Sequence, residues 1–320
     1  MTAAHLDAAA EILAARQRRL RHGRPELPEA YTTAEACGPV LAALLERPGA
    51  HGVYASQAGQ NAGYFIGYPR TEPIWGRACW SPMEGSALAD GVGAETIRDL
   101  YAAWAEDFVR SGYFLHYAHA SPDEPELMAA WMRTGFGQMQ AYAVREVGMP
   151  AAEEAKGVTI RRAAPADIDR LEPLLPLIAQ ALMRPPAYAI SLPEDIPTYR
   201  DSWLEELSGS EGRHWLAEED DRALAMASFY PAEPDPMVPD GAWYLALAMT
   251  LPEARGRGLM RALLATGFDE ARSQGVTHCV TDWRTASLPT HRSWTALGFR
   301  PTHYRLHRHI DERIAWAAPR

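Results

Sequence analysis

Cysteine is scarce in this chain of 320 residues. The three cysteines, Cys37, Cys79 and Cys279, are odd in number and widely spaced. A disulfide framework needs paired cysteines, and a zinc site needs closely spaced ones. The sequence therefore predicts free thiols in a reducing, cytoplasmic location and no bound metal.

Long apolar runs are also missing, since no stretch approaches the ~20 residues that a membrane helix needs. The amino-terminal segment 1–23 carries Asp7 and Glu11 early and arginines late, without a small-residue cleavage site after an apolar stretch. This pattern is typical of an amphipathic helix and differs from a signal peptide. No membrane partner is expected.

Positive charge is in deficit, because 31 lysines and arginines face 41 aspartates and glutamates, a formal charge of −10. A phosphate backbone requires a basic protein surface, so nucleic acid is not expected as a partner. The acidity fits a cationic or amine substrate, although acidity also serves solubility and that alternative stays open.

What the chain does contain is a repeated pattern. The segments 131–136 and 294–299 both read W-x-x-x-G-F, each after a strand, a proline-containing break and a helix. His119 precedes the first tryptophan by the same spacing as Asp282 precedes the second. One shared motif could be chance, but the same motif in the same order of elements indicates an internal duplication.

The polar stretch 148–157 is the expected linker between domains at 1–147 and 158–320. Strands and helices mix within each half, which predicts an α+β fold of two tandem domains, each a central mixed sheet flanked by helices. In the first half the second of two leading helices is expected to begin at a capping box, Thr32 and Glu35. Strands are expected at 158–163, 243–250, 276–283 and 301–310, helices at 94–110 and 198–208, and hairpin turns at Asp220–Asp221 and near Gly59–Gly63.

The segment LPEARGRGLMRALL, residues 251–264, follows the apolar strand 243–250 and opens a helix. Gly256 and Gly258 let the backbone approach a ligand closely, and the unpaired N–H groups of a helix start favour an anion. Nearby arginines add charge-assisted donors. The segment predicts a diphosphate site, with a turn of solvated arginines as the alternative.

The residues of this segment exclude two other nucleotide-binding motifs. A P-loop needs Gly-Lys-Ser/Thr, which the segment lacks, and a dinucleotide fingerprint needs a third glycine where Arg261 stands.

The order strand, P-E-x-R-G-x-G-L, helix resembles the acetyl-CoA motif of GNAT-type N-acetyltransferases. Arg255 and Gly258 match that motif, whereas Met260 stands where glycine or alanine is usual. Further along, Ser287 takes the place of the family's asparagine and Trp294 that of its tyrosine, before a matching Leu-Gly-Phe. The tandem arrangement resembles actinobacterial tandem acetyltransferases.

The resemblance implies that acetyl-CoA is the cofactor and that the domain 158–320 holds it. The loop ALADGVGAET before helix 94–110 lacks the arginines, so we expect the first domain to be a degenerate copy that binds acetyl-CoA poorly or not at all. The implied cofactor contacts are Ala248, Met249, Thr250, Arg255, Gly256, Arg257, Gly258, Leu259, Met260, Arg261 and Ser287.

Acetyl transfer to an amine needs a base, and Asp282 falls where ribosomal-protein-alanine acetyltransferases of this family carry a catalytic glutamate. The alternative is that Asp282 caps the following loop or pairs with Arg284. Tyr244 is a weaker candidate base. Because Trp294 is no practical proton donor, either Ser287 or water is left as the acid, or the thiolate leaves unassisted and is protonated later.

The expected function is transfer of an acetyl group from acetyl-CoA to a primary amine of a small molecule or peptide, by a monomer or homodimer. Glu233, Asp235 and Asp240 either attract the ammonium group or form a solvated loop. Met260 and Trp294 keep an alternative open, a catalytically inactive acyl-CoA-binding or regulatory protein on the same scaffold.

Overall fold

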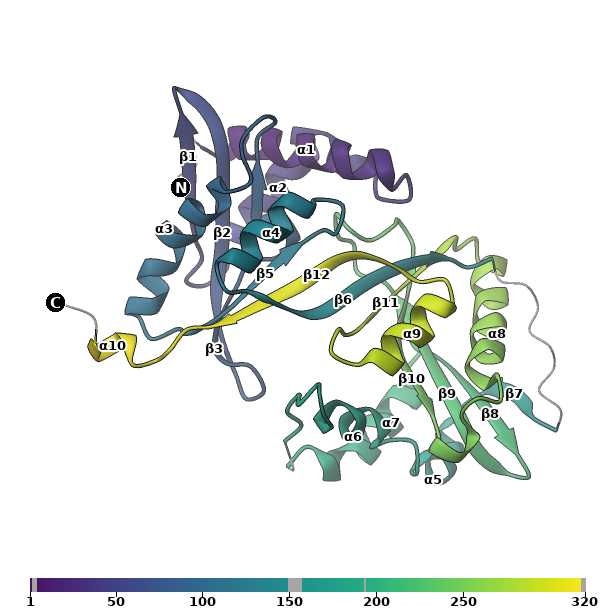
Figure 1. Ribbon diagram of the computed structural model, residues 1–320. Coiled ribbons are helices and arrows are strands. Elements are labelled where there is room, and N and C mark those ends of the chain that lie inside the picture. The colour runs from purple at the N-terminus through teal and green to yellow at the C-terminus, as the bar shows by residue number, and fades with distance from the viewer. Residues whose placement is uncertain (2–4, 149–156, 193, 318–320) are drawn as a thin grey trace. The chain divides into compact units, whose positions relative to one another are not determined.

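The chain forms two compact units in the computed structural model, which describes residues 1, 5–148, 157–192 and 194–317 (Figure 1). The predicted linker 148–157 falls, apart from its end residues, outside this range. Unit 1 comprises Met1–Ala141, Asp235–Asp240 and Pro301–Arg320, and unit 2 comprises Tyr142–Pro234 and Gly241–Arg300.

Unit 1 is built on the strand order β1-β2-β3-β5-β12, in which β3 and β5 run parallel and the other pairs antiparallel. The turn of its first hairpin lies at Ala58 and Gly59, both with positive φ, close to the predicted position. The elements are α1 (Leu6–Gly23), α2 (Ala34–Leu45), β1 (His51–Gln57), β2 (Gln60–Glu72), β3 (Gly76–Trp80), β4 (Ser86–Leu88), α3 (Thr96–Arg110), β5 (Leu115–Ala120), α4 (Pro125–Arg133), β12 (Arg300–His309), α10 (Ile314–Ala317) and two short 3-10 turns (Ala30–Thr32, Met83–Gly85).

The start of α2 differs from the predicted capping box. Thr33 is the N-cap, since its hydroxyl accepts a hydrogen bond from the backbone N–H of Ala36. Thr32 belongs to the preceding 3-10 turn and donates its hydroxyl to the carbonyl of Glu29. The predicted cap was wrong by one residue because the 3-10 turn already uses Thr32.

Unit 2 has the strand order β6-β11-β10-β9-β8-β7, with β10 and β11 parallel. Strand β6 (Gly137–Glu146) begins in unit 1 and ends in unit 2. The β8–β9 hairpin turns at Asp220 and Asp221, both with positive φ, as predicted. The elements are β7 (Thr159–Arg162), a 3-10 turn (Pro165–Asp167), α5 (Ile168–Leu171), α6 (Leu177–Met183), a 3-10 turn (Ile196–Thr198), α7 (Tyr199–Ser208), β8 (Arg213–Glu219), β9 (Arg222–Pro231), β10 (Trp243–Thr250), a 3-10 turn (Pro252–Ala254), α8 (Leu259–Ser273), β11 (His278–Arg284) and α9 (Leu288–Ala296).

Helices cover both faces of the sheet in unit 2 (Figure 1). On one face α8 packs closely, since a Cβ added at Gly267 would lie 2.5 Å from the ring of Phe229. On the other face Trp203 of α7 packs against His214, with ring centroids 5.9 Å apart. These two layers bury the strands that carry the predicted site.

The W-x-x-x-G-F motif is a helix ending in both units. After α9, Gly298 adopts φ +87°, and the N–H of Phe299 donates to the carbonyl of Trp294 at 3.0 Å. Residues 131–136 repeat this geometry after α4. Only glycine adopts this left-handed conformation readily, and the returning phenylalanine packs on the tryptophan. The repeated motif therefore has a structural role.

Within the described residues, no helix combines the length and apolar character required to cross a membrane.

Candidate functional site

Strands β10 and β11 separate partway along their length. Their parallel ladder runs from Trp243 beside Cys279 to Leu245 beside Thr281, and the Thr281 hydroxyl donates to the Leu245 carbonyl at 2.8 Å. Residues 246–250 and 282–284 lie beyond the last pair. The two strands no longer pair with each other beyond this point, and we call this unpaired stretch the gap.

A bulge in β10 decides which side chains line this gap. The register against β9 shifts between Leu245 and Leu247, so Tyr244 lies opposite Tyr230 and Leu247 opposite Ser228. An inserted residue reverses the alternation of side chains along a strand. Tyr244 and Leu247 consequently project from the same face, the one that α7 covers.

The glycine–arginine turn leads from the end of β10 into α8. Gly256 and Gly258 both adopt φ +77°, and a Cβ added at either would meet nothing within 4 Å. The first turn of α8 contains no acidic residue. An exposed helix start beside open space is the arrangement expected for an anion site, because unpaired N–H groups and the helix dipole act together there.

The three predicted arginines have different surroundings. Arg257 forms a bidentate ion pair with Glu219 at the end of β8, at 2.6 and 3.0 Å. Arg255 points back, and its Nε donates to the carbonyl of Thr250 at 3.4 Å. Arg261 is exposed on the first turn of α8. Glu219 was missed by the sequence analysis, because nothing local connects a hairpin end to an arginine 38 residues away.

The remaining predicted cofactor residues flank this turn. Met249 is 3% exposed and Leu259 2% exposed, so at these positions a ligand in the gap or at the turn meets mainly backbone. Ala248 and Thr250 alternate with Met249 along β10, so their side chains project from the opposite face of the strand to that of Met249. They lie beside Ala227 and Ala225 of β9. Met260 is half-buried in the first turn of α8.

Asp282 and Tyr244 meet where the gap begins. The Tyr244 hydroxyl donates to Oδ1 of Asp282 over 2.5 Å, and both residues are half-buried. A base must reach the proton it removes, and a hydrogen-bonded, half-buried carboxylate at a strand end meets that geometric requirement. The two candidate bases therefore form one unit, which the sequence analysis treated separately.

Ser287 lies at the N-terminus of α9, and its hydroxyl is 2.7 Å from that of Thr290. Trp294 is 8% exposed, with its ring 5.5 Å from that of Phe299 in edge-to-face contact. The indole thus belongs to the core of unit 2.

Cys279 is not a nucleophile in this fold. Its side chain is fully buried, and burial raises the pKa of the thiol to about 12. The thiolate would be a negligible fraction at neutral pH.

The equivalent strands of unit 1 stay connected. Beyond the pair Trp80–Tyr117, the N–H of Ser81 donates to the Tyr117 carbonyl at 2.9 Å. His119, the counterpart of Asp282 by spacing, donates through Nδ1 to the Ser81 carbonyl at 2.9 Å. Hydrogen bonds thus close the position that is open in unit 2.

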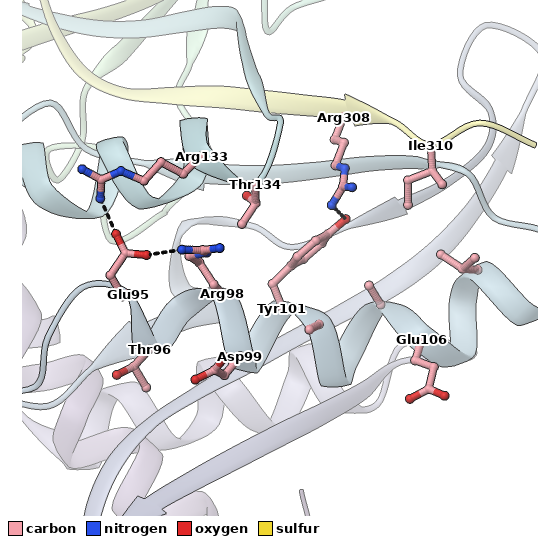
Figure 2. A pocket seen from close by; sticks show the side chains of 13 residues that line it. Glu95, Thr96, Arg98, Asp99, Tyr101, Glu106, Arg133, Thr134, Arg308 and Ile310 are labelled. Carbon is pink, nitrogen blue, oxygen red and sulfur yellow. Dashed lines mark hydrogen bonds and ion pairs between the residues drawn. The ribbon is translucent and has the colours of Figure 1, made fainter. Parts of the chain in front are cut away.

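The start of α3 in unit 1 differs from the start of α8 because it carries carboxylates as well as arginines. Figure 2 shows Glu95 between Arg98 and Arg133, with an ion pair to each. The hydrogen bond from Arg98 lowers the pKa of the Glu95 carboxyl, and Asp99 adds a second acid in the first turn. Glu95 already pairs with both arginines here, so a diphosphate would have to compete with this carboxylate for them.

The acidic loop residues are divided between the units. Asp235 and Asp240 belong to unit 1, where the Asp235 carboxylate accepts from the N–H of Met237 at 2.7 Å. Glu233 lies in unit 2 and is exposed.

Comparison with known proteins finds a family model that matches the segment containing the gap. Residues 178–299 match the model of the Acetyltransferase (GNAT) family. This confirms the resemblance found in the sequence, and acyl transfer is the general activity of that family. No curated protein sequence matches the chain.

Solved structures resemble both units. A GCN5-related N-acetyltransferase from Sphaerobacter thermophilus matches with a TM-score of 0.58 and 18% identity, over 96% of this chain and 93% of that one. A tandem GNAT protein from the clavulanic acid biosynthesis pathway has a TM-score of 0.46 and 15% identity, over 92% and 93% of the two chains. The PaiA N-acetyltransferase from Thermoplasma acidophilum, solved with coenzyme A, has a TM-score of 0.38 and 13% identity, over 48% and 98%. The fold class predicted from the sequence, two tandem GNAT-like domains with mixed sheets, is confirmed.

Proposed function

We propose that unit 2 transfers an acetyl group from acetyl-CoA to a primary amine of a small molecule or peptide. The observation that carries this proposal is the gap between β10 and β11, which continues into the open glycine turn at the start of α8. A thioester in the gap and a diphosphate at the turn would lie on one continuous path along β10.

The turn would hold the diphosphate mainly through backbone. Gly256 and Gly258 leave room for phosphate oxygens, while Arg257 and Arg261 supply charge-assisted donors. Arg255 secures the end of β10 through Thr250. Arg257 is paired with Glu219. A bound diphosphate would therefore either replace Glu219 as the partner of the guanidinium or share the guanidinium with it.

Acetyl-CoA would supply an activated thioester, and the residues of the gap would position the acceptor. Asp282 accepts a proton from the ammonium group, directly or through one water, and Tyr244 holds the carboxylate in place. The amides of Ala248, Met249 and Thr250 are the candidate donors to the thioester oxygen, since fixed donors stabilise developing negative charge. Ser287 is the candidate acid.

Unit 1 is proposed to bind no cofactor. Its strands are closed by Ser81 and His119, and its α3 begins among carboxylates. One acetyl-CoA per chain is therefore expected.

A regulatory acyl-CoA-binding protein is the second candidate. Trp294 favours it, because this core residue stands where the family has a tyrosine and cannot take over proton donation. Incubation with labelled acetyl-CoA and a panel of primary amines tests the two. Labelled amide product supports the enzyme. Thermal stabilisation by coenzyme A without product from any amine supports the binder, and no stabilisation contradicts both.

A further inference from the structure

An apolar pocket of about 270 Å³ opens in unit 2 on the face of the sheet that α6 and α7 cover. Leu247 and Met249 of β10 contribute one wall, and Tyr199 and Trp203 of α7 contribute another. We call it the α6–α7 pocket. Its other lining residues are Leu175, Ile178, Ala179, Leu182, Ile190 and Ser191.

The chemistry of this pocket is almost purely hydrocarbon. None of its described lining residues is charged, and its two hydroxyl groups, on Ser191 and Tyr199, are hydrogen-bonded to each other at 2.9 Å. A charged group placed here would lose its hydration without gaining a partner. The lining therefore favours an apolar ligand group.

The bulge in β10 places this pocket on the same face as the candidate base. Tyr244 pairs with Tyr230, and Leu247 pairs with Ser228, two residues along β9. Two residues of strand span about 7 Å. An ammonium group beside Asp282 would consequently lie a short spacer away from the pocket edge at Leu247.

The size of the pocket limits what enters it. Ligand sites for drug-sized molecules span about 300–1,000 Å³, so this pocket suits one small group, although it is much larger than an acetyl methyl requires. Ile190, 59% exposed, lies at its edge, and Tyr188 close by in the chain is 73% exposed. Apolar surface left open at a pocket rim is typical of a ligand-binding site.

We propose that the acceptor is a primary amine carrying one apolar group, aryl or branched alkyl, on a short spacer. The apolar group lies in the α6–α7 pocket, and the ammonium group lies beside Asp282. This inference rests on the proposed function and specifies its substrate class.

The test compares 2-phenylethylamine with ethylamine and ethanolamine at saturating acetyl-CoA. Burying a phenyl-sized group should raise kcat/KM for the aryl amine about 10- to 100-fold over ethylamine. Ala179→Trp fills the pocket and should remove this preference. Ala181→Trp, at an exposed position of the same helix, should leave the preference intact.

A binding measurement gives a second readout. The ¹⁹F signal of 4-fluorophenethylamine should broaden or shift with the wild-type chain and the Ala181→Trp chain, and stay unchanged with Ala179→Trp. Matching circular dichroism and melting temperatures of the two variants would exclude unfolding as the cause.

Several results would overturn the proposal. Equal kcat/KM for aryl and small amines, or full aryl preference in Ala179→Trp, removes the pocket assignment while amine acetylation itself stands. A preference for long-chain acyl-CoA donors that Ala179→Trp abolishes would assign the pocket to the acyl chain. Absence of both amide product and coenzyme A binding would instead defeat the proposed function.

Discussion

The hydroxyl of Tyr244 on β10 donates to the carboxylate of Asp282 on β11, over 2.5 Å. The two residues lie 38 positions apart in the chain, and the parallel pairing of their strands brings them together. We expect this pair to act as one unit, with Asp282 as the base and Tyr244 as the residue that positions it.

Asp282→Asn should lower kcat by about 10²- to 10⁴-fold, the usual contribution of a general base, and leave the Kd for coenzyme A unchanged. Tyr244→Phe should lower kcat less, since the carboxylate remains. The double variant should be no slower than Asp282→Asn alone, because partners in one network are not additive. Full activity of Asp282→Asn across the pH range would remove its role as the base.

Gly258→Ala tests the open turn at the start of α8. The left-handed conformation costs a non-glycine residue about 1 kcal/mol, and the new Cβ would enter the space proposed for the diphosphate. Gly275→Ala is the matched control, since Gly275 follows α8 with φ +79° and equal open space. Both variants should lose similar free energy of unfolding, but only Gly258→Ala should weaken coenzyme A binding, measured by calorimetry. Equal affinities would contradict the diphosphate assignment.

Arg257→Glu should weaken coenzyme A binding about tenfold or more, because a donor is lost and the new carboxylate repels both the diphosphate and Glu219. Arg272→Glu, the same charge change in the last turn of α8, is the control and should leave the Kd unaltered. Glu219→Gln should have the reverse effect and tighten binding several-fold, since it releases Arg257. Titrations of all three variants would check these directions.

Calorimetric titration of the wild-type chain should give one coenzyme A per chain. Carboxylates at Glu95 and Asp99 oppose an anion at the start of α3 in unit 1. A second equivalent that survives Arg257→Glu would show that unit 1 also binds the cofactor.

Acid should remove a stabilising contribution that the neutral His116 makes to unit 1. Burial lowers the pKa of His116 to about 4, where its Nδ1 accepts from Tyr101 and its Nε2 donates to the carbonyl of Tyr113. The unfolded chain, with a histidine pKa near 6.5, binds more protons between about pH 6.5 and 4. The stabilising contribution of neutral His116 is therefore complete above about pH 6.5 and is lost as the pH falls toward 4.

Urea-unfolding midpoints at pH 7.5 and pH 5 measure this loss. Between pH 6.5 and 5 it should amount to about 2 kcal/mol for His116. His116→Gln should reduce the pH dependence without abolishing it, because burial also lowers the pKa of His119 to about 4, and should lower stability at pH 7.5. An unchanged slope in the variant would contradict the assignment.

The sequence by itself determined much of this protein. Glycine and arginine before an apolar helix predicted the turn at Gly256 and Gly258, because few other residues allow a left-handed start open to solvent. The strand 243–250 was predicted at its observed bounds, since its apolar run is bounded by turn residues. A turn or a single strand of this kind depends on consecutive residues, so the sequence is enough to predict it.

The tertiary structure alone decided how distant residues meet. Strand β12 belongs to unit 1, where it pairs with β5, although it directly follows the motifs of unit 2. The contact of Tyr244 with Asp282 and the ion pair of Arg257 with Glu219 depend on how the strands pair. The α6–α7 pocket depends in addition on the bulge in β10. A register shift of a single residue moves a side chain to the opposite face of a sheet, and no local pattern in the sequence specifies where such a shift occurs.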